Sequence, residues 1–387
     1  LMTLASGIAN GYGCVLFPEG TSHNDSYMLR FRTGPMRTVL AAGALAATSN
    51  KPLPVLIPLG LHFRQKEHFR TDVWVEYGEP IQVESEDIPD NLIEAVGDGT
   101  WSEPPAESVF RLRDNLREKL VPLSPDVHSW DEYRGLQLLG HVKGRLEGNP
   151  PKSWSQEVQS ARHFRNHFAN QQRTLDADDL QPPKITHPLV EKAEQAAEIL
   201  HNNGLDGRDL NRQSDGLRRA NLAKLPLAAS RIALFTVLSP VFLLSLLPQI
   251  VLGRILGDST DEGIDARTSY QFLAAMFGSI TIWPISSTII VALSYWQSGE
   301  IDAMFGFDWT TVLGQGSITV WATIVIAWLL MFPISLLTGR LFSLVWDDYV
   351  DLRGSYRRAR FSKSDQQKLA AALGEIKREL ADFDLTL

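Results

Sequence analysis

The chain has 387 residues, of which 44% are hydrophobic and 21% are charged, so it can hold two or three domains and is not intrinsically disordered. Its formal net charge of −8 argues against a nucleic acid partner. The single cysteine, Cys14, excludes an intramolecular disulfide and is expected to be a small core residue.

The amino-terminal stretch predicts a helix, a strand and a ligand-binding turn, in that order. Residues 1–10 favour a helix, and the short apolar run 13–17 favours a strand that is buried on both faces. Pro18 and Gly20 cannot extend that strand, so polar side chains should project at its carboxyl end, where open α/β sheets bind ligands. The residues expected to bind substrate in this turn are Phe17, Pro18, Glu19, Gly20, Thr21 and Ser22.

A basic helix start follows the turn. Residues 36–47 are rich in alanine and predict a helix, with Thr33 as its cap and Pro35 in its first turn. Free backbone N–H groups and the positive end of the helix dipole favour an anion at such a position, and a phosphate would fit. Three arginines crowd the same place: Arg30, Arg32 and Arg37.

These residues resemble one protein family. Phe-Pro-Glu-Gly-Thr at 17–21 is similar to the acceptor-binding motif of the glycerophospholipid acyltransferases, which acylate glycerol 3-phosphate and lysophosphatidic acid. Residues 54–61, with Pro58 at their centre, and residues 73–81 resemble two later blocks of that family, in the family's order. The resemblance implies an α/β fold, with part of an acyltransferase sheet and flanking helices, and it places Pro58 in the substrate site.

The resemblance also implies roles for charged residues near the turn. In the family a basic residue shortly before a glycine helps to hold the acceptor's phosphate, and Arg32 before Gly34 occupies that place. Many members carry arginine directly after the motif, where this chain has Ser22, so Arg30 or Arg32 is left to supply the charge. Glu19 is expected to accept hydrogen bonds from the acceptor's hydroxyls or from backbone amides that hold the turn in shape.

The family's catalytic His-x-x-x-x-Asp motif lies well upstream of the turn, and residues 1–13 do not contain it. No catalytic residue is therefore assigned within the chain. Amino-terminal truncation is the expected explanation, and a degenerate relative that never had the pair is the alternative. The other histidines with nearby acids are interpreted as surface, strand-end or solvated-helix residues, and no metal site is assigned: His62, His68, His128, His163 and His167.

The rest of the soluble part alternates strands with helices and then becomes wholly helical. Residues 53–63 predict another interior strand, and residues 73–77 predict a strand nearer the edge of the sheet. Apolar residues at helical spacing from Val109 to Leu120 predict an amphipathic helix. The carboxyl-terminal part of an acyltransferase domain is therefore expected over 1–125, and a polar helical region with an apolar face from Leu189 to Leu200 is expected over 126–225.

Three charge-free segments, 232–252, 272–296 and 311–339, each reach the ~20 residues that cross a bilayer. They predict an integral membrane domain over 226–345, with a cytoplasmic helical tail over 346–387. Basic residues before the first segment and after the last place both flanks in the cytoplasm, which three full crossings cannot satisfy. Because Pro240 and Pro248 interrupt the first segment, it is expected to be a re-entrant or interfacial hairpin followed by two crossings.

The resemblance and the membrane segments together imply a membrane-bound O-acyltransferase of phospholipid biosynthesis. The expected acceptor is glycerol 3-phosphate or 1-acylglycerol 3-phosphate (lysophosphatidic acid), and the expected donor is acyl-CoA or acyl-carrier protein, without a further cofactor. The basic stretch 353–363 is expected to touch anionic membrane lipids. The alternative is a catalytically inactive membrane scaffold or regulator that retains a lipid-phosphate-binding remnant.

Overall fold

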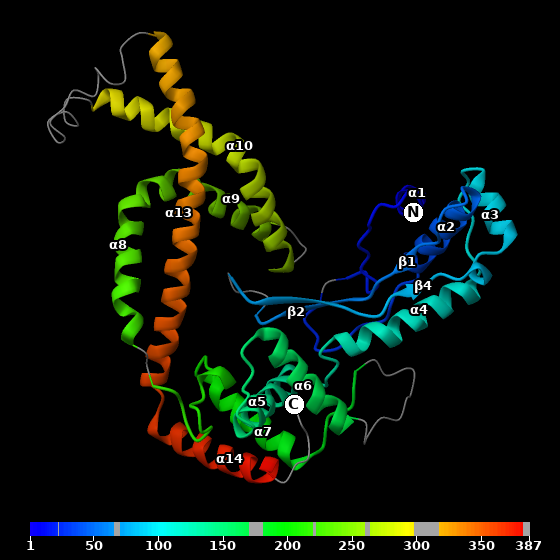
Figure 1. The fold of residues 1–387 in the computed structure, drawn as a ribbon, viewed down its shortest axis with the longest axis horizontal. Coiled ribbons are helices and arrows are strands. Elements are labelled where there is room, and N and C mark those ends of the chain that lie inside the picture. The colour runs from blue at the N-terminus through cyan, green and yellow to red at the C-terminus, as the bar shows by residue number, and fades with distance from the viewer. Residues whose placement is uncertain are drawn as a thin grey trace. The chain divides into compact units, whose positions relative to one another are not determined.

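The chain forms two compact units, both dominated by helices (Figure 1). Unit 1 joins residues 1–65, 71–219 and 357–387, and unit 2 joins residues 66–70 and 220–356. Unit 1 thus contains segments that lie before and after unit 2 in the sequence. The computed structural model describes residues 1–21, 23–65, 70–169, 181–219, 222–259, 264–297 and 317–381.

The amino-terminal half of unit 1 packs four helices around one apolar cluster that includes Leu40, Leu92 and Leu116. The predicted helices over 1–10 and 36–47 are confirmed. Thr33 is the residue before the second of them, although its side chain makes no capping hydrogen bond, and Pro35 lies in the first turn as expected. The four helices are α1 (Met2–Ala9), α2 (Gly34–Thr48), α3 (Asp90–Gly97) and α4 (Ala106–Leu120).

Within the described residues the strands form two small antiparallel sheets, and the larger acyltransferase sheet that the resemblance implied is not confirmed. β1 pairs with β4, and β2 pairs with β3. The strand over 73–77 is confirmed, but the single interior strand over 53–63 is wrong, because residues 57 and 58 divide it and Leu61 and Phe63 are exposed. The strands are β1 (Val55–Leu56), β2 (Leu59–Phe63), β3 (Val73–Tyr77) and β4 (Ile81–Gln82).

The predicted buried strand over 13–17 is also wrong. Val15 and Phe17 are 69% and 68% exposed, and Cys14 is exposed rather than in a core. A strand is stable only where a neighbouring strand takes up its N–H and C=O groups, and no strand of the described residues pairs with this segment. Apolar composition alone therefore overestimated its burial.

The carboxyl-terminal half of unit 1 is a helical bundle with one continuous core. The apolar face predicted from Leu189 to Leu200 is confirmed, since those residues are buried on α7. The carboxyl-terminal helix α14 buries Leu369 and Leu373 in the same core, together with residues of α5. The bundle helices are α5 (Trp130–Leu146), α6 (Trp154–Ala169), α7 (Pro188–Asn202) and α14 (Lys363–Ala381).

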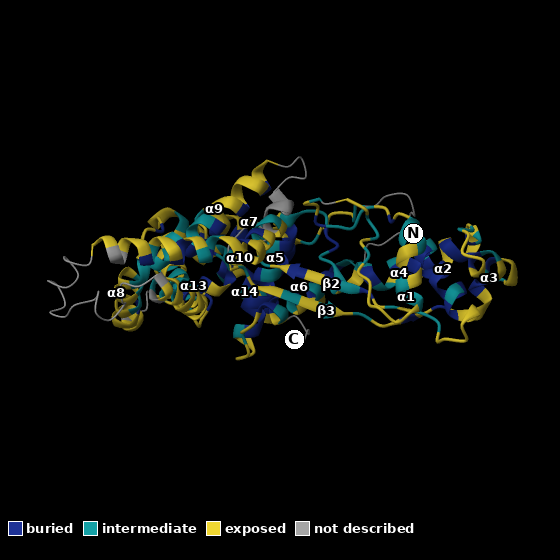
Figure 2. Ribbon diagram, turned by 90° about the horizontal axis from the view of Figure 1, so that it is seen from above, coloured by how far each residue is buried: buried dark blue, intermediate teal, exposed yellow. Residues whose placement is uncertain are grey.

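The described residues of unit 2 contain three candidate membrane spans by length and composition: Leu225–Asp258, Ser269–Leu293 and Val320–Ala359. Only 11%, 28% and 11% of their most apolar windows are buried, so most of their side chains are free to face lipid, as the exposed surface of α8 in Figure 2 illustrates. The three predicted segments are therefore apolar helices, although residues 311–316 lie outside the described residues. The elements are α8 (Leu225–Val241), the π-helix η5 (Phe242–Leu246), α9 (Leu247–Asp258), α10 (Ile264–Trp296) and α13 (Ser317–Ala359).

Candidate functional site

The Phe-Pro-Glu-Gly-Thr segment forms a tight turn held against the chain that leads into α2. The backbone N–H of Gly20 donates to the carbonyl of Phe17 at 3.2 Å, and the N–H of Arg32 donates to the carbonyl of Pro18 at 2.6 Å. Gly20 has a φ of +67°, and a Cβ built on it would lie 3.0 Å from Cγ of Arg32. Glycine is therefore required both for the backbone conformation and for the close approach of the arginine.

The carboxylate of Glu19 ties the two ends of the following loop together. Its Oε1 accepts a hydrogen bond from the backbone N–H of Leu29 at 2.7 Å and lies 2.9 Å from Nε2 of His23. Of the two roles expected for Glu19, the bond that holds the backbone is therefore the one present in the structure. The loop 19–29 depends on this carboxylate for its shape.

Contacts from the start of α5 and from the chain just before it hold the same loop. Ser26 donates through Oγ to the carbonyl of Val127 at 2.8 Å. Trp130, at the start of α5, donates from Nε1 to the carbonyl of Asn24 at 2.6 Å. The loop is thus fixed at several points and presents the turn on a rigid support.

Two of the three arginines near the turn keep their charge uncompensated. Arg30 and Arg32 are exposed, and within the described part of the chain neither forms an ion pair, whereas Arg37 pairs with Glu103. The exposed side chain of Thr21 lies in the same turn, next to Gly20. The arrangement offers guanidinium and hydroxyl donors to an anion.

The remaining predicted site residues lie in different settings. Pro58 is buried between β1 and β2, and its carbonyl accepts a hydrogen bond from the N–H of Gly78 at 2.9 Å, so its visible role is to shape the strand connection. Phe17 is exposed. Ser22 lies outside the described residues.

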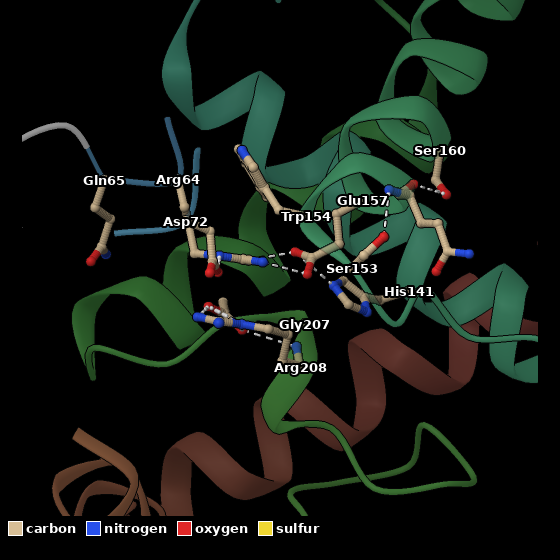
Figure 3. Close-up of polar contacts among 12 residues, drawn as sticks. Arg64, Gln65, Asp72, His141, Ser153, Trp154, Glu157, Ser160, Gly207 and Arg208 are labelled. Carbon is tan, nitrogen blue, oxygen red and sulfur yellow. Dashed lines mark hydrogen bonds and ion pairs between the residues drawn. The ribbon is translucent and has the colours of Figure 1, made fainter. Parts of the chain in front are cut away.

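A buried ion cluster that the sequence did not reveal joins the β2–β3 hairpin to α5 and α6 (Figure 3). Arg64 donates two hydrogen bonds to the carboxylate of Glu157, at 2.6 and 2.7 Å, and Nε2 of His141 lies 3.3 Å from the same carboxylate. Arg145 donates to Nδ1 of His141 at 3.3 Å, so in the neutral imidazole Nε2 carries the proton that faces Glu157. We refer to Arg64, Glu157 and His141 as the Glu157 cluster.

A second group of the same composition lies on the same hairpin, and we refer to it as the Glu76 cluster. Arg162 of α6 donates two hydrogen bonds to Glu76, at 2.7 and 2.5 Å, and Nε2 of His62 lies 2.9 Å from that carboxylate. His62 is only 4% exposed and stacks on Trp74. The expectation of a surface or strand-end histidine is therefore wrong for His62, which is a buried, paired residue of β2.

The pKa shifts of these groups follow from burial and charge. Burial lowers the pKa of His62 and outweighs the hydrogen bond with Glu76, which raises it. Burial alone would raise the pKa of Glu76, but its interactions with Arg162 and His62 together outweigh burial and lower it. Burial is outweighed in the same way for Glu157, whose pKa is lowered by His141 and Arg64. Both clusters thus hold ionised carboxylates beside buried histidines.

Acidification is therefore expected to destabilise unit 1 in two stages. The pKa of His62 lies below its ordinary value of 6.5, so its contribution is complete above pH 6.5 and is lost as the pH falls through the folded-state pKa. The contributions of Glu76 and Glu157 to stability are complete above pH 4.5, the ordinary pKa of a glutamate. They are lost as the pH falls below that value and through the lowered folded-state pKa values. Melting temperatures measured by circular dichroism across this range should show both stages, and His62→Gln should remove much of the first one. A melting temperature that stays constant down to pH 4.5 would contradict the assignment.

A His-x-x-x-x-Asp spacing does occur in the chain, at His201 and Asp206, but downstream of the turn. His201 is exposed at the end of α7, and its pKa is lowered by partial burial and by the charge of Arg134, with Asp131 acting in the opposite direction. Asp206 instead caps a short helical turn by accepting from the N–H of Arg208 at 2.9 Å. The spacing thus belongs to two residues with separate structural roles, and no catalytic pair is assigned to them.

Comparison with known proteins gives one partial similarity. Over 139 residues the chain is 31% identical to "Glycerol-3-phosphate O-acyltransferase 2" of Saccharomyces cerevisiae. The aligned part is 35% of this chain and 17% of the yeast protein, so the chain spans less than a fifth of that relative. No family model matches the chain, and no solved structure matches it. The similarity supports a distant relationship to glycerolipid acyltransferases.

Proposed function

We propose that the chain is part of a membrane-bound glycerolipid O-acyltransferase and that its turn at 17–21 binds the phosphate-bearing acceptor. The acceptor is glycerol 3-phosphate or its 1-acyl derivative, and the donor is a thioester, acyl-CoA or acyl-carrier protein. The similarity to the yeast enzyme and the three apolar helices of unit 2 support this reading. Unit 1 lies on the cytoplasmic side, as the basic residues flanking the membrane segments favour.

The observation that carries the proposal is the position of Arg32 beside the turn. The backbone N–H of Arg32 is bonded to the carbonyl of Pro18 and its side chain passes close to Gly20, so an exposed guanidinium stands beside the turn. A guanidinium can donate two parallel hydrogen bonds to a phosphate, and the start of α2 adds favourable backbone dipoles. These donors bind the acceptor's phosphate and leave its hydroxyl free to react.

Arg32→Ala is expected to raise the dissociation constant for glycerol 3-phosphate by about tenfold or more, because a hydrogen bond to a charged group contributes about 1.5–3 kcal/mol. Calorimetric titration of the detergent-purified chain measures this directly. Arg37→Ala is the matched control, since Arg37 is already paired with Glu103 and should leave binding unchanged.

Two outcomes separate the proposal from its alternatives. If the wild-type chain and the Arg32→Ala variant bind glycerol 3-phosphate with equal affinity, the proposed phosphate site is refuted. Transfer of a radiolabelled acyl group from acyl-CoA to glycerol 3-phosphate, assayed in membranes that contain the protein, tests the activity itself. Acceptor binding without any transfer is the result expected of a lipid-phosphate-binding scaffold.

A further inference from the structure

Unit 1 contains residues that precede the three apolar segments in the sequence and residues that follow them. Leu373 of α14, which follows the last apolar helix, is buried in the same core as Leu136 of α5, which precedes the first. Lys192 of α7 pairs with Glu379 of α14 at 2.7 Å. Because both flanks fold into one core, they lie on one side of any membrane that unit 2 crosses.

Two flanks on one side require an even number of crossings, yet the described residues of unit 2 include three apolar segments long enough to cross. One segment must therefore enter and leave by the same face. The first, Leu225–Asp258, is the one interrupted in its middle: Pro240 and Pro248 bracket the π-helix η5. π-Helical turns and prolines are the usual causes of a sharp change in helix direction, and Figure 1 shows the axis changing direction between α8 and α9.

Contacts with α13 show how far α8 reaches. At its start Lys224 pairs with Asp351 at 2.9 Å, and Arg231 pairs with Asp348 at 3.0 Å. At the far end of η5, the side chain of Leu246 lies beside Gly339.

Along α13 the distance from Asp351 to Gly339 is about 18 Å at about 1.5 Å per residue. The hydrocarbon core is about 30 Å thick, and the charge-free run of α13 only begins at Gly339 and extends away from α8 toward residue 317. The apex of α8 and η5 therefore stops near one edge of that run.

Contacts with α10 show that α9 returns. Gly253 of α9 packs against Gln271 of α10, and Gln249 packs against Gly278, so α9 is antiparallel to the first half of α10. Arg254 and Asp258 then place charges at the end of α9, as Lys224 and Arg231 do at the start of α8. Charged residues thus lie at both ends of the element formed by α8, η5 and α9, which indicates that both ends are in polar surroundings.

We propose that α8, η5 and α9 form a re-entrant element that binds the acyl chains of one leaflet, on the side where α8 begins and α9 ends, and that α10 and α13 are the two crossings. This inference does not depend on acyl transfer. The surface that meets the lipid consists of exposed apolar side chains on both arms: Leu234, Val237, Leu243, Ile250 and Ile255.

Single cysteines in a Cys14→Ser background test the topology. Ser259→Cys probes the end of α9, Gln367→Cys probes α14, and Gln297→Cys probes the far end of α10. In sealed vesicles of the full chain, a membrane-impermeant maleimide should label Ser259→Cys and Gln367→Cys to the same extent. Gln297→Cys should be protected in vesicles where the other two cysteines are labelled. In vesicles of inverted orientation Gln297→Cys should be labelled and the other two should be protected.

Labelling of Ser259→Cys together with Gln297→Cys would overturn the proposal, because α8 and α9 would then cross the membrane. Labelling of all three cysteines from one face would overturn it as well, since α10 would not cross. Ser269→Cys, at the start of α10, is a second probe of the same level and should match Gln367→Cys even if the Ser259 variant is poorly expressed.

Discussion

Glu157→Ala is expected to lower the free energy of unfolding by about 3–5 kcal/mol, the cost of removing one partner from a buried ion pair. The side chain of Glu157 is 6% exposed, and it neutralises Arg64, which is 13% exposed, and accepts from His141. Without the carboxylate, the guanidinium keeps only the exposed carboxylate of Asp72, 2.8 Å from its Nε, in a poorly solvated place between β2 and α6. Urea titration followed by circular dichroism measures the loss.

Two further variants show whether the loss comes from the buried charge. Asp131→Ala removes an exposed partner of Arg134 and should change stability by less than about 0.5 kcal/mol. The double variant Arg64→Met with Glu157→Leu should recover most of the loss, because an apolar pair of similar volume replaces a buried ion pair at little cost. A loss below about 1 kcal/mol in Glu157→Ala would show that water solvates Arg64.

Local sequence signals predicted those elements whose stability is itself local. The alanine-rich run with Pro35 in its first turn gave α2, and apolar residues at helical spacing gave α7 with its face from Leu189 to Leu200. The strand β3 has the predicted bounds because Val73 and Val75 alternate with more deeply packed residues. Each of these patterns is set by the geometry of a single element.

Long-range pairing was not readable from the same signals. The apolar run 13–17 has the composition of an interior strand, but burial depends on a partner strand, and residues far away in the sequence decide whether one is present. The Glu157 cluster was missed for the same reason, since Glu157 follows Arg64 by 93 residues. One signal was present: His62 and Arg64 alternate with the exposed Leu61 and Phe63, so polar side chains occupy the inward positions at the end of β2.

The candidate site was partly predictable because its parts are close in sequence. The approach of Arg32 to the turn at Gly20 follows from a short loop between them. The hydrogen bond between Glu19 and the Leu29 amide did not follow, because the loop's path depends on its attachment to Val127 and Trp130. The position of Glu19 thus raises a question of mechanism that the sequence left open.

Glu19→Ala is expected to weaken glycerol 3-phosphate binding by about 10- to 150-fold, equivalent to the about 1.5–3 kcal/mol of a hydrogen bond to a charged group. If Glu19 acts by holding the loop that carries Arg30 and Arg32, inorganic phosphate should lose affinity in parallel, because the phosphate donors are what the loop positions. If Glu19 instead binds the acceptor's hydroxyls, inorganic phosphate should bind the variant as it binds the wild type. Calorimetry with both ligands separates the two roles.

Glu19→Gln sharpens the distinction, because its amide oxygen can still accept from the Leu29 N–H while its charge is lost. The loop-holding role predicts that Glu19→Gln retains most of the affinity and that hydrogen exchange at the Leu29 amide accelerates in the alanine variant alone. Rapid exchange at Leu29 in the wild-type chain would refute that role, since the amide would then be open to water. The hydrogen bond from the Leu29 N–H to Glu19 therefore links the conformation of the loop to the affinity of the site, and these two variants measure both.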